Sequence, residues 1–566
     1  MATDNIARAM AARAGKSANR SASVDAIANA IIASGKSVTA YNAAMQMWFK
    51  HKLPTEWTPL QLTALCDEWY TITRTGWAGY SKFYQPNVTA VSDGEKCGDN
   101  AGLVCIPSTD TEANRDDYAG LPMFAVCDCN WVVDSDTLEP VVTDIDGITD
   151  GFERNNPERF VGVLQMAPWH FWQDDDSTYL HGVADHRVNE YEHVEPVPEA
   201  IRIDGTMRPW VLHGKYMSCT VDGRMTNCAG KIPTGFMSHN SLHGLSSKNG
   251  SQYSGGTTAD DGWMKLMNFV KYANITADGI RQGCCNYNYQ YPAAVSEAGV
   301  TRVLLTNAQA SNLVVGSSVI IGSYNGSLDR SSASVYSITG PGGAVITRIE
   351  RVVVNETQYS AVYIDVSNVF DTIANGASKT GTTYISTWFW RSGSCDAVRG
   401  SDGSLGDNIS GNYPAKLQGI EYSVGGYEVY ADVVQKMVND AYTPWIVRRS
   451  KQQASSITAN YIDAGIDYKQ PASDGWTYPK KMEYKNGVFY PCESGGSSST
   501  YLRDGFYANK AGTAGTREWL AFGRLTVGSA SGGLSCLNGP YALSFGWWGS
   551  LARLSPNGNR GEFSGV

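Results

Sequence analysis

The chain has 566 residues and a formal net charge of −10, because 55 acidic residues outnumber 45 basic ones. This balance argues against nucleic acid as a partner, since nucleic-acid-binding proteins need basic patches to neutralise phosphate. The length exceeds what one hydrophobic core organises, so three or four domains are expected. Abundant Gly (59), Tyr (31) and Trp (16), with only 18% charged residues, are typical of loop-rich β proteins.

Export signals, membrane spans and disulfides are not expected. The first 22 residues are basic and rich in Ala and Ser, and they lack the apolar stretch of a secretory signal. No window of about eighteen apolar residues occurs, which argues against a membrane span. Twelve cysteines are sparse for this length, and neither Cys127-Asp-Cys129 nor Cys284-Cys285 has a favourable disulfide spacing. Buried free thiols are therefore expected, and no cofactor is predicted.

Three short helices are predicted near the N-terminus. The first has Ser23 as its N-cap and Gly35 beyond its end, the second starts at Ser37, and the third starts at Thr58-Pro59. Their apolar faces comprise Val24, Ile27, Ala28, Ile31 and Ile32; Tyr41, Ala44, Met45, Trp48 and Phe49; and Leu62, Leu65, Cys66 and Trp69. Such short helices need partners, within the chain, on symmetry mates or in a larger assembly. Residues 1–75 are thus expected to be an attachment or oligomerisation region.

Residues 76–235 are expected to form a β-rich domain. Strand patterns broken by turns occur at Phe124–Trp131, Val141–Gly147 and Phe160–Met166. A polar group in this region contains potential metal ligands, namely His181, Asp185, His186, Glu190 and His193. It lacks the H-x-H and H-E-x-x-H spacings of metal sites, so a solvated polar edge is the favoured interpretation and no metal is predicted.

A helix and a second β region follow. Thr258 or Asp260 could cap a helix whose apolar stripe is expected to be core, and residues Gly283–Tyr291 should then be extended. Further strands are predicted at Val303–Leu305, Leu313–Val315, Val319–Ile321, Val345–Val354, Ala361–Val366, Tyr384–Trp390, Leu417–Glu421 and Tyr427–Tyr430. Residues 297–385 would form a small barrel or sandwich.

Three stretches resemble tail or fibre proteins of bacteriophages that infect gut bacteria. They are Ile201–Trp210 with His213–Tyr216, Asp260–Tyr272, and Leu417–Glu421. The resemblance runs from about residue 120 to the end. It implies a C-terminal C-type lectin-like domain, a fold also used by the variable tropism determinants that retroelements diversify. This domain would comprise residues 236–296 and 386–566, with 297–385 as an insertion, giving an α+β, β-rich multidomain protein.

The resemblance implies a tail-fibre or receptor-binding protein without enzymatic activity. It would be assembled in the host cytoplasm and exposed on the virion. Its partners would be other tail or capsid proteins and a glycan or protein receptor on the bacterial surface. A homo-oligomer is expected, often a trimer in such proteins, because avidity multiplies weak affinities.

The aromatic, Gly-rich C-terminal tail is the expected ligand-binding face. Trp and Tyr provide large contact areas, while Gly, Ser and Asn let a loop adapt its hydrogen bonds. Trp519 is expected in the core, whereas the binding residues are expected to be Asn538, Tyr541, Trp547, Trp548 and Arg553. The E-P-N, Q-P-D and W-N-D motifs of calcium-dependent lectins do not occur, so no calcium site is implied. Sugar would be bound by ring stacking; a protein or a teichoic-acid-like target is equally open.

Three other functions are compatible with parts of the sequence. The first is a purely structural role, as a head fibre or tail collar component. The second is glycan cleavage by paired carboxylates, for which Asp134, Asp136, Asp144 and Asp146 are candidates, although D-x-D patterns next to strands favour turns. The third is the formylglycine-forming oxidase of the same broad fold, but Cys492 and Cys536 lack its motif context.

Overall fold

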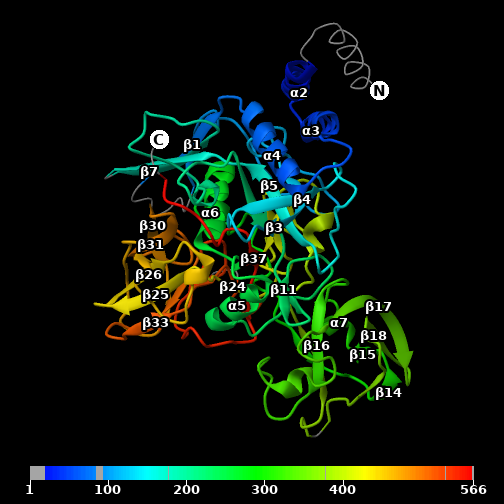
Figure 1. Cartoon of the computed structure of the whole chain (residues 1–566). Coiled ribbons are helices and arrows are strands. Elements are labelled where there is room, and N and C mark those ends of the chain that lie inside the picture. The colour runs from blue at the N-terminus through cyan, green and yellow to red at the C-terminus, as the bar shows by residue number, and fades with distance from the viewer. Residues whose placement is uncertain (1–19, 85–92, 176, 377, 529–530, 564–566) are drawn as a thin grey trace.

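The computed structural model describes residues 20–84, 93–175, 177–376, 378–528 and 531–563 (Figure 1). Most of the basic N-terminal segment, residues 1–19, lies outside these ranges. The chain has an α+β architecture in which strands predominate, arranged in several sheets around a few helices. None of the described helices combines the length and hydropathy needed to cross a membrane.

The N-terminal helices follow local sequence signals. They are α2 (Arg20–Gly35), α3 (Val38–Lys52) and α4 (Pro59–Ile72). Ser37 caps α3, and Thr58 forms a capping box with Gln61 at the start of α4. The predicted apolar face of α3 is buried; in α4, Leu65 is only half-buried and Tyr70 is buried in addition. These two helices and their starting residues are confirmed.

The predicted limits of α2 are wrong at both ends. The helix already includes Ser23, which was expected to cap it, and extends through Gly35. No Gly or Pro lies between Arg20 and Ser23, so nothing in that short stretch stops the helix at Ser23. Asp25 on α2 accepts a 2.6 Å hydrogen bond from the indole of Trp48 on α3, which joins the two helices.

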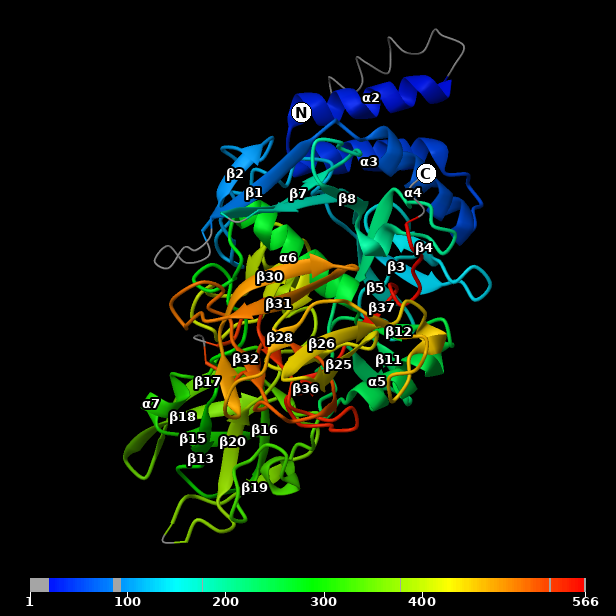
Figure 2. The same cartoon turned by 90° about the vertical axis from the view of Figure 1, so that its left-hand side faces the viewer.

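The helices pack within the chain. The Trp69 indole donates to the Tyr41 hydroxyl at 2.8 Å, which links α4 to α3. The Trp210 indole, from the β-rich region, donates to the Asp67 carboxylate of α4 at 2.8 Å. Figure 2 shows α2 and α3 at one end of the molecule, next to β1 and β7. Intramolecular packing of the helices is therefore confirmed, while contacts with other subunits stay a prediction.

Residues 76–235 contain two antiparallel sheets, of strand order β2-β1-β7-β6-β8 and β4-β3-β5-β9, and the hairpin β10–β11. The strands are β1 (Ala78–Tyr84), β2 (Glu95–Gly98), β3 (Cys127–Val133), β4 (Pro140–Ile145), β5 (Phe160–Met166), β6 (Trp169–Asp174), β7 (Thr178–Ala184), β8 (His193–Pro196), β9 (Trp210–Gly214), β10 (Cys219–Val221) and β11 (Arg224–Thr226). The buried strand predicted over residues 160–166 is confirmed. The strand predicted from Phe124 starts only at Cys127, because a turn hydrogen bond links the Phe124 N–H to the Leu121 carbonyl.

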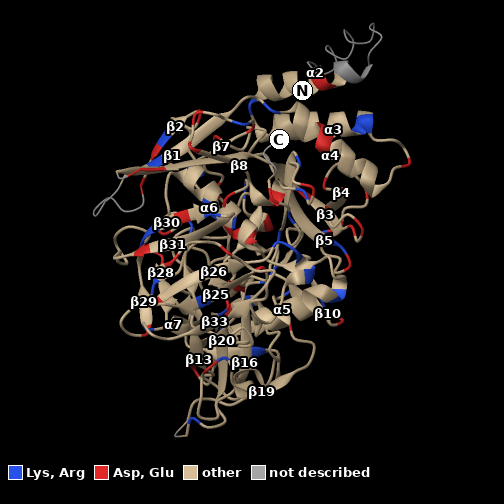
Figure 3. Ribbon diagram, turned by 60° about the vertical axis from the view of Figure 1, so that its left-hand side comes forward, with Lys and Arg blue, Asp and Glu red and all other residues tan. Residues whose placement is uncertain are grey.

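Figure 3 shows basic residues interspersed with acidic ones over the described chain.

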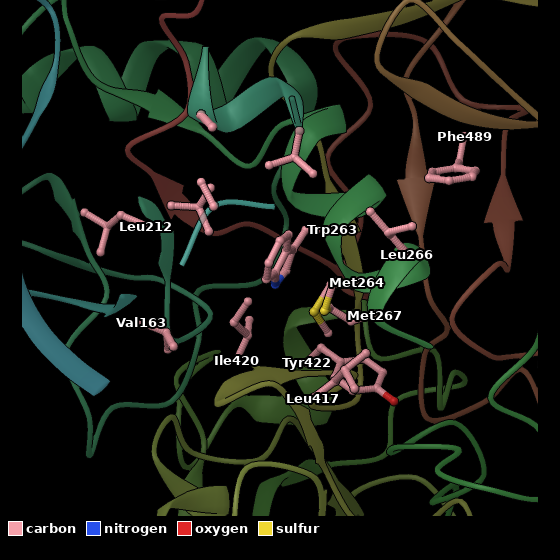
Figure 4. Close-up of a cluster of buried hydrophobic side chains, with 14 of the residues drawn as sticks. Val163, Leu212, Trp263, Met264, Leu266, Met267, Leu417, Ile420, Tyr422 and Phe489 are labelled. Atoms are coloured by element: carbon pink, nitrogen blue, oxygen red, sulfur yellow. The ribbon is translucent and has the colours of Figure 1, made fainter. Parts of the chain in front are cut away.

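Helix α6 (Thr258–Tyr272) runs through the middle of the molecule. Its cap is Thr257, one residue before the first predicted candidate, and Asp260 completes the capping box. Fourteen of its residues are buried, so the helix is covered on all sides and not only along the predicted stripe. Figure 4 shows Trp263 of this helix among Val163, Leu212 and Ile420. The helix thus joins the N-terminal sheets to the C-terminal segment.

A continuous hydrophobic core reaches from Val24 in α2 to Leu554 near the C-terminus. It includes buried side chains from the regions 1–75, 76–235 and 386–566. A separate core cluster lies in the segment from Ala293 to Ile385. The proposed division into four parts stays a prediction, although the inserted segment has this core of its own.

The inserted segment protrudes from the rest of the molecule in Figure 1. It forms a sheet of order β13-β20-β16-β17-β18-β15 beside the pair β14–β19, and this path is open, so the described strands form no barrel. The elements are β13 (Gln290–Pro292), β14 (Glu297–Val300), β15 (Arg302–Leu305), α7 (Asn307–Ala310), β16 (Ser318–Ser323), β17 (Ala344–Val354), β18 (Thr357–Ile364), β19 (Phe370–Thr372) and β20 (Thr383–Thr387). The strand predicted over residues 313–315 is wrong: a turn follows α7 there, with the Leu313 N–H bonded to the Ala310 carbonyl. Of the extended stretch predicted over residues 283–291, only its end belongs to a strand, β13.

The C-terminal region consists of short strands connected by long loops. They are β21 (Gly403–Ser404), β22 (Ala415–Leu417), β23 (Ile420–Tyr422), β24 (Tyr427–Val429), β25 (Val433–Val438), β26 (Ala441–Ile446), β27 (Ile462–Asp463), β28 (Tyr468–Lys469), β29 (Gly475–Thr477), β30 (Pro479–Lys485), β31 (Val488–Ser494), β32 (Phe506–Ala508), β33 (Gly515–Arg517), β34 (Leu520–Ala521), β35 (Leu537–Asn538), β36 (Ser550–Leu551) and β37 (Leu554–Ser555). β37 pairs with β12 (Ser254–Gly255), which lies between α5 (His239–Ser246) and α6. The two ends of the region that contains α5 and α6 are therefore joined.

Candidate ligand-binding face

The loop of residues 539–549, between β35 and β36, carries most of the aromatic residues of the C-terminal tail. It is anchored from both sides: the Glu518 N–H donates to the Tyr541 carbonyl at 3.0 Å, and the Asn240 N–H donates to the Leu543 carbonyl at 2.9 Å. At its end the Ser550 hydroxyl donates to the Trp547 carbonyl at 2.7 Å. Segments distant in sequence thus fix the loop and the rings that it presents.

Tyr541, Phe545 and Trp547 form one stacked group on this loop, which we call the aromatic platform. The Tyr541 and Phe545 ring centroids lie 4.7 Å apart at 9°, and those of Tyr541 and Trp547 lie 6.1 Å apart at 28°. Phe545 is 42% exposed, and the other two rings are half-buried. Nearly parallel rings held by a fixed loop offer a flat apolar surface to a ligand.

Arg524 extends the aromatic platform with a positive charge. Its guanidinium carbon lies 3.9 Å from the Trp547 ring centroid. The Arg524 Nε is buried and has no hydrogen-bond partner among the described residues. An arginine held flat on a ring can bind an acidic or hydroxyl-rich group without a large entropic cost.

Trp548 is buried beside the aromatic platform, with its ring centroid 5.0 Å from that of Trp547. It is 3% exposed, and its ring stacks on Trp388 at 5.6 Å and on Phe389 at 6.2 Å. The Arg330 guanidinium carbon lies 5.2 Å from the Trp548 ring centroid; burial and the nearby charge of Arg524 lower the pKa of Arg330 to about 9. The expectation that Trp548 is exposed is wrong, because successive side chains point in different directions and Trp548 fills a core cluster.

Asn538 and Arg553 are also buried, at 4% and 3% exposure. The Asn538 amide donates to the Tyr427 hydroxyl at 3.1 Å, and β35 is an interior strand of its sheet. Arg553 binds the Glu428 carboxylate at 3.1 Å and donates to the Gly214 carbonyl at 2.8 Å. Their expected place on the ligand face is wrong, since both side chains are buried and donate hydrogen bonds to groups inside the protein.

Of the five residues expected to bind a ligand, only Tyr541 and Trp547 reach the surface. The structure adds Phe545 and Arg524 to them. Phe545 was detectable as an aromatic residue between Ser544 and Gly546, a setting typical of surface loops. Arg524 was not, because only the tertiary fold brings it to Trp547. Trp519 is fully buried, which confirms its predicted place in the core.

The histidine-rich group is not assembled into one site. His181 is buried and shares a 3.1 Å hydrogen bond with His170; burial lowers the pKa of His181 to about 3. Asp185 is buried and accepts a 2.5 Å hydrogen bond from the Thr75 N–H. The solvated polar edge is thus wrong for His181 and Asp185, whereas His186, Glu190 and His193 are exposed.

One group of potential metal ligands occurs among the described residues, formed by Cys105, Asp116 and Asp402. The Lys271 ammonium lies 2.9 Å from Asp402 and 3.2 Å from Asp116, where a cation would bind. Lys271 therefore supplies the positive charge at this position.

All twelve thiols are free and nine are buried, as expected from the sequence.

Three of the four candidate catalytic carboxylates, Asp134, Asp144 and Asp146, have structural partners. Asp134 accepts hydrogen bonds from the Thr137 N–H at 2.7 Å and from the Asp136 N–H, which confirms a turn at this D-x-D pattern. Asp144 accepts from the Thr149 hydroxyl at 2.9 Å.

Asp146 pairs with Arg154 at 2.8 Å. The two cysteines of the oxidase hypothesis form no disulfide. Cys492 donates to the Lys481 carbonyl at 3.6 Å, and Cys536 is buried.

Comparison with known proteins gives no family assignment. No family model matches the chain, and no curated protein has a significant sequence match to it. The functional inference therefore depends on the geometry above and on the resemblance of the three sequence stretches.

Proposed function

We propose that this chain is a bacteriophage virion protein that binds the bacterial surface, and that the aromatic platform contacts the receptor. The observation that carries the proposal is the stacked, partly exposed group of Tyr541, Phe545 and Trp547 with the Arg524 guanidinium against it. Rings in this arrangement suit the apolar faces of sugars, and Arg524 can donate to hydroxyl or acidic groups. A surface glycan is therefore the proposed receptor.

A C-type lectin-like domain is part of this proposal. The pairing of β12 with β37 supports it, because the region between them then forms a unit whose first and last strands are adjacent. Two helices lie beside this pair, and long loops with short strands follow them. In such a domain the 539–549 loop would belong to the ligand face, and the inserted segment 297–385 would form a separate projection.

The virion would display several copies, and we propose a homo-oligomer, with a trimer as the first possibility to test. Single platforms of this size would bind a glycan weakly, and a multivalent arrangement would raise the apparent affinity. Light scattering of the purified chain would give the oligomeric state.

Binding of the fluorescently labelled full-length protein to a panel of intact gut bacteria would test the proposal. Phe545→Ser removes the most exposed ring of the platform and should leave the fold intact. We expect a loss of cell binding of about tenfold, the effect of truncating a central aromatic contact. Trp169→Ala is the control, since Trp169, like Trp547 of the platform, is half-buried with an arginine, Arg187, 5.6 Å from its ring.

Three outcomes would contradict parts of the proposal. Binding that is unchanged in Phe545→Ser would exclude the platform as the contact. Failure of the wild-type protein to bind any strain, together with immunolabelling on the capsid or tail collar, would favour the purely structural role. Protease treatment of cells that abolishes binding, while periodate treatment does not, would replace the glycan with a protein receptor.

A further inference from the structure

A cavity far from the 539–549 loop in sequence lies between strand β6, the neighbouring edge strand β8 and the hairpin β30–β31. Its volume is about 370 Å³, and we call it the Trp172 pocket. Figure 2 shows the hairpin beneath the sheet that contains β7 and β8. The lining includes the aromatic side chains Trp172, Tyr179, His181, His193 and Tyr484, the carboxylates Asp174, Glu192, Glu195 and Glu483, and Lys485.

The aromatic wall of the Trp172 pocket is rigid. Trp172 stacks between His170, at 4.8 Å, and His193, at 5.0 Å. The Tyr484 ring meets Trp172 edge-on at 4.8 Å and 78°. Since Trp172 and His193 are paired residues of adjacent strands, the sheet fixes the arrangement. An organic cation is attracted by the electron-rich face of an aromatic ring.

The charges of the Trp172 pocket favour a cation. Four carboxylates face one lysine, and the Lys485 ammonium donates to the Gly465 carbonyl at 3.1 Å. Asp174 pairs with Lys481. The Glu195 and Glu483 carboxylates form no hydrogen bond, and no ion pair within 4 Å, with any residue that the structure describes. An added positive charge would therefore gain two acceptors without breaking an existing pair.

A larger cavity near α3 shows the opposite situation. It measures about 430 Å³ and contains a similar number of charges. There Asp128 is already paired with Lys215 at 2.7 Å, and Asp396 lies 3.3 Å from the same ammonium. Its acidic groups are neutralised by basic side chains, so of these two cavities only the Trp172 pocket has carboxylates without an ion-pair partner among the described residues.

The Tyr484 hydroxyl favours a ligand with a hydrogen-bond donor, independently of the charges of the pocket. Its side chain lines the pocket and is 6% exposed, yet the buried hydroxyl has no hydrogen-bond partner among the described residues. An unpaired buried hydroxyl destabilises the protein, and a ligand that donates a hydrogen bond to it would remove this cost. A primary ammonium has three N–H donors and can satisfy both the hydroxyl and the carboxylates.

We infer that the Trp172 pocket binds the primary ammonium group of an organic molecule, in contact with Trp172, Glu195, Glu483 and Tyr484. Two sources present this group on a carbon skeleton, an amino sugar and a lysine side chain. The site is separate from the aromatic platform, so the two can be tested independently.

Calorimetric titration of the full-length protein would test this inference. The probes are glucosamine, Nα-acetyl-lysine amide, and N-acetylglucosamine, in which acetylation removes the charge. We expect millimolar binding of at least one amine and none of N-acetylglucosamine; whichever amine binds more tightly identifies the source. The double variant Glu195→Gln, Glu483→Gln should weaken amine binding about tenfold, at roughly 0.7 kcal/mol for each exposed charge pair.

Two variants complete the design. Tyr484→Phe removes only the unpaired hydroxyl and should weaken amine binding two- to fivefold without affecting folding. Glu112→Gln changes an exposed carboxylate outside the pocket and should have no effect. The inference would be overturned by equal binding of glucosamine and N-acetylglucosamine, by unchanged affinity in the double variant, or by no heat with either amine at tens of millimolar. Phe545→Ser should retain amine binding, which separates this result from the proposed function.

Discussion

The Arg553 guanidinium and the Glu428 carboxylate form a two-point ion pair, with Nε–Oε1 and Nη2–Oε2 distances of 3.1 and 3.2 Å. Both side chains are almost completely buried. Arg553 also donates to the Gly214 and Glu421 carbonyls. One side chain near the C-terminus therefore holds together strand β9 of the N-terminal half and strands β23 and β24 of the C-terminal half.

Replacing Arg553 by Met should destabilise the protein by about 3–5 kcal/mol, because the Glu428 charge would stay buried without a partner. Adding Glu428→Gln to this variant should recover part of the loss, since the neutral amide costs less to bury. The midpoint of chemical unfolding, followed by tryptophan fluorescence, gives both values. If the double variant is no more stable than Arg553→Met, the ion pair does not account for the loss.

Local signals in the sequence predicted the helices well and the binding face only in part. The starts of α3 and α4 depend on Ser37 and Thr58, whose capping partners are within three residues. The burial of Arg553 depends on Glu428, 125 residues away in the chain. No periodicity or spacing contains such a pairing, so the composition of a tail rich in Gly, Asn and Trp predicts more exposed side chains than the structure has.

The aromatic platform also depends on a long-range contact. A Cβ atom added at Gly546 would lie 2.4 Å from the Phe236 carbonyl oxygen, so a side chain cannot be added there without moving the loop. Gly546→Ala should destabilise the protein by about 1–3 kcal/mol and weaken binding to bacterial cells. Gly244→Ala is the control, because its added Cβ meets no atom within 4 Å and lies in α5, where Ala stabilises. Equal cell binding by both variants would show that the position of this loop does not matter.

Calcium should not affect stability. The three-ligand group of Cys105, Asp116 and Asp402 already faces the Lys271 ammonium, and a divalent ion would have to displace it from the core. The thermal unfolding temperature should therefore be the same in EDTA and in millimolar calcium. An increase of several degrees with calcium would reveal a site that the lysine does not block. Lys271→Met should lower the unfolding temperature in both solutions, because it leaves two carboxylates without a counter-charge.

Glu518 should make the protein less stable as the pH rises. Its side chain is fully buried; Oε2 accepts a 3.0 Å hydrogen bond from the His239 N–H, and Oε1 has no partner among the described residues. Burial raises the pKa of Glu518 from 4.5 to about 8. Between these values the folded protein keeps a proton that the unfolded chain releases, so this group reduces stability as the pH increases through that window.

Glu518→Gln keeps the shape of the protonated acid and removes the titration. The variant should match the wild type in unfolding temperature below about pH 4 and become progressively more stable than it up to about pH 8, where the difference levels off. Glu112→Gln, an exposed carboxylate, should follow the wild-type curve at every pH. Comparing each variant with the wild type at the same pH cancels the contributions of the other titrating groups to stability. One of these is His239, whose lowered pKa affects stability at the acidic end of the range. Parallel curves for Glu518→Gln and the wild type would mean that Glu518 is ionised in the folded state and finds a counter-charge there.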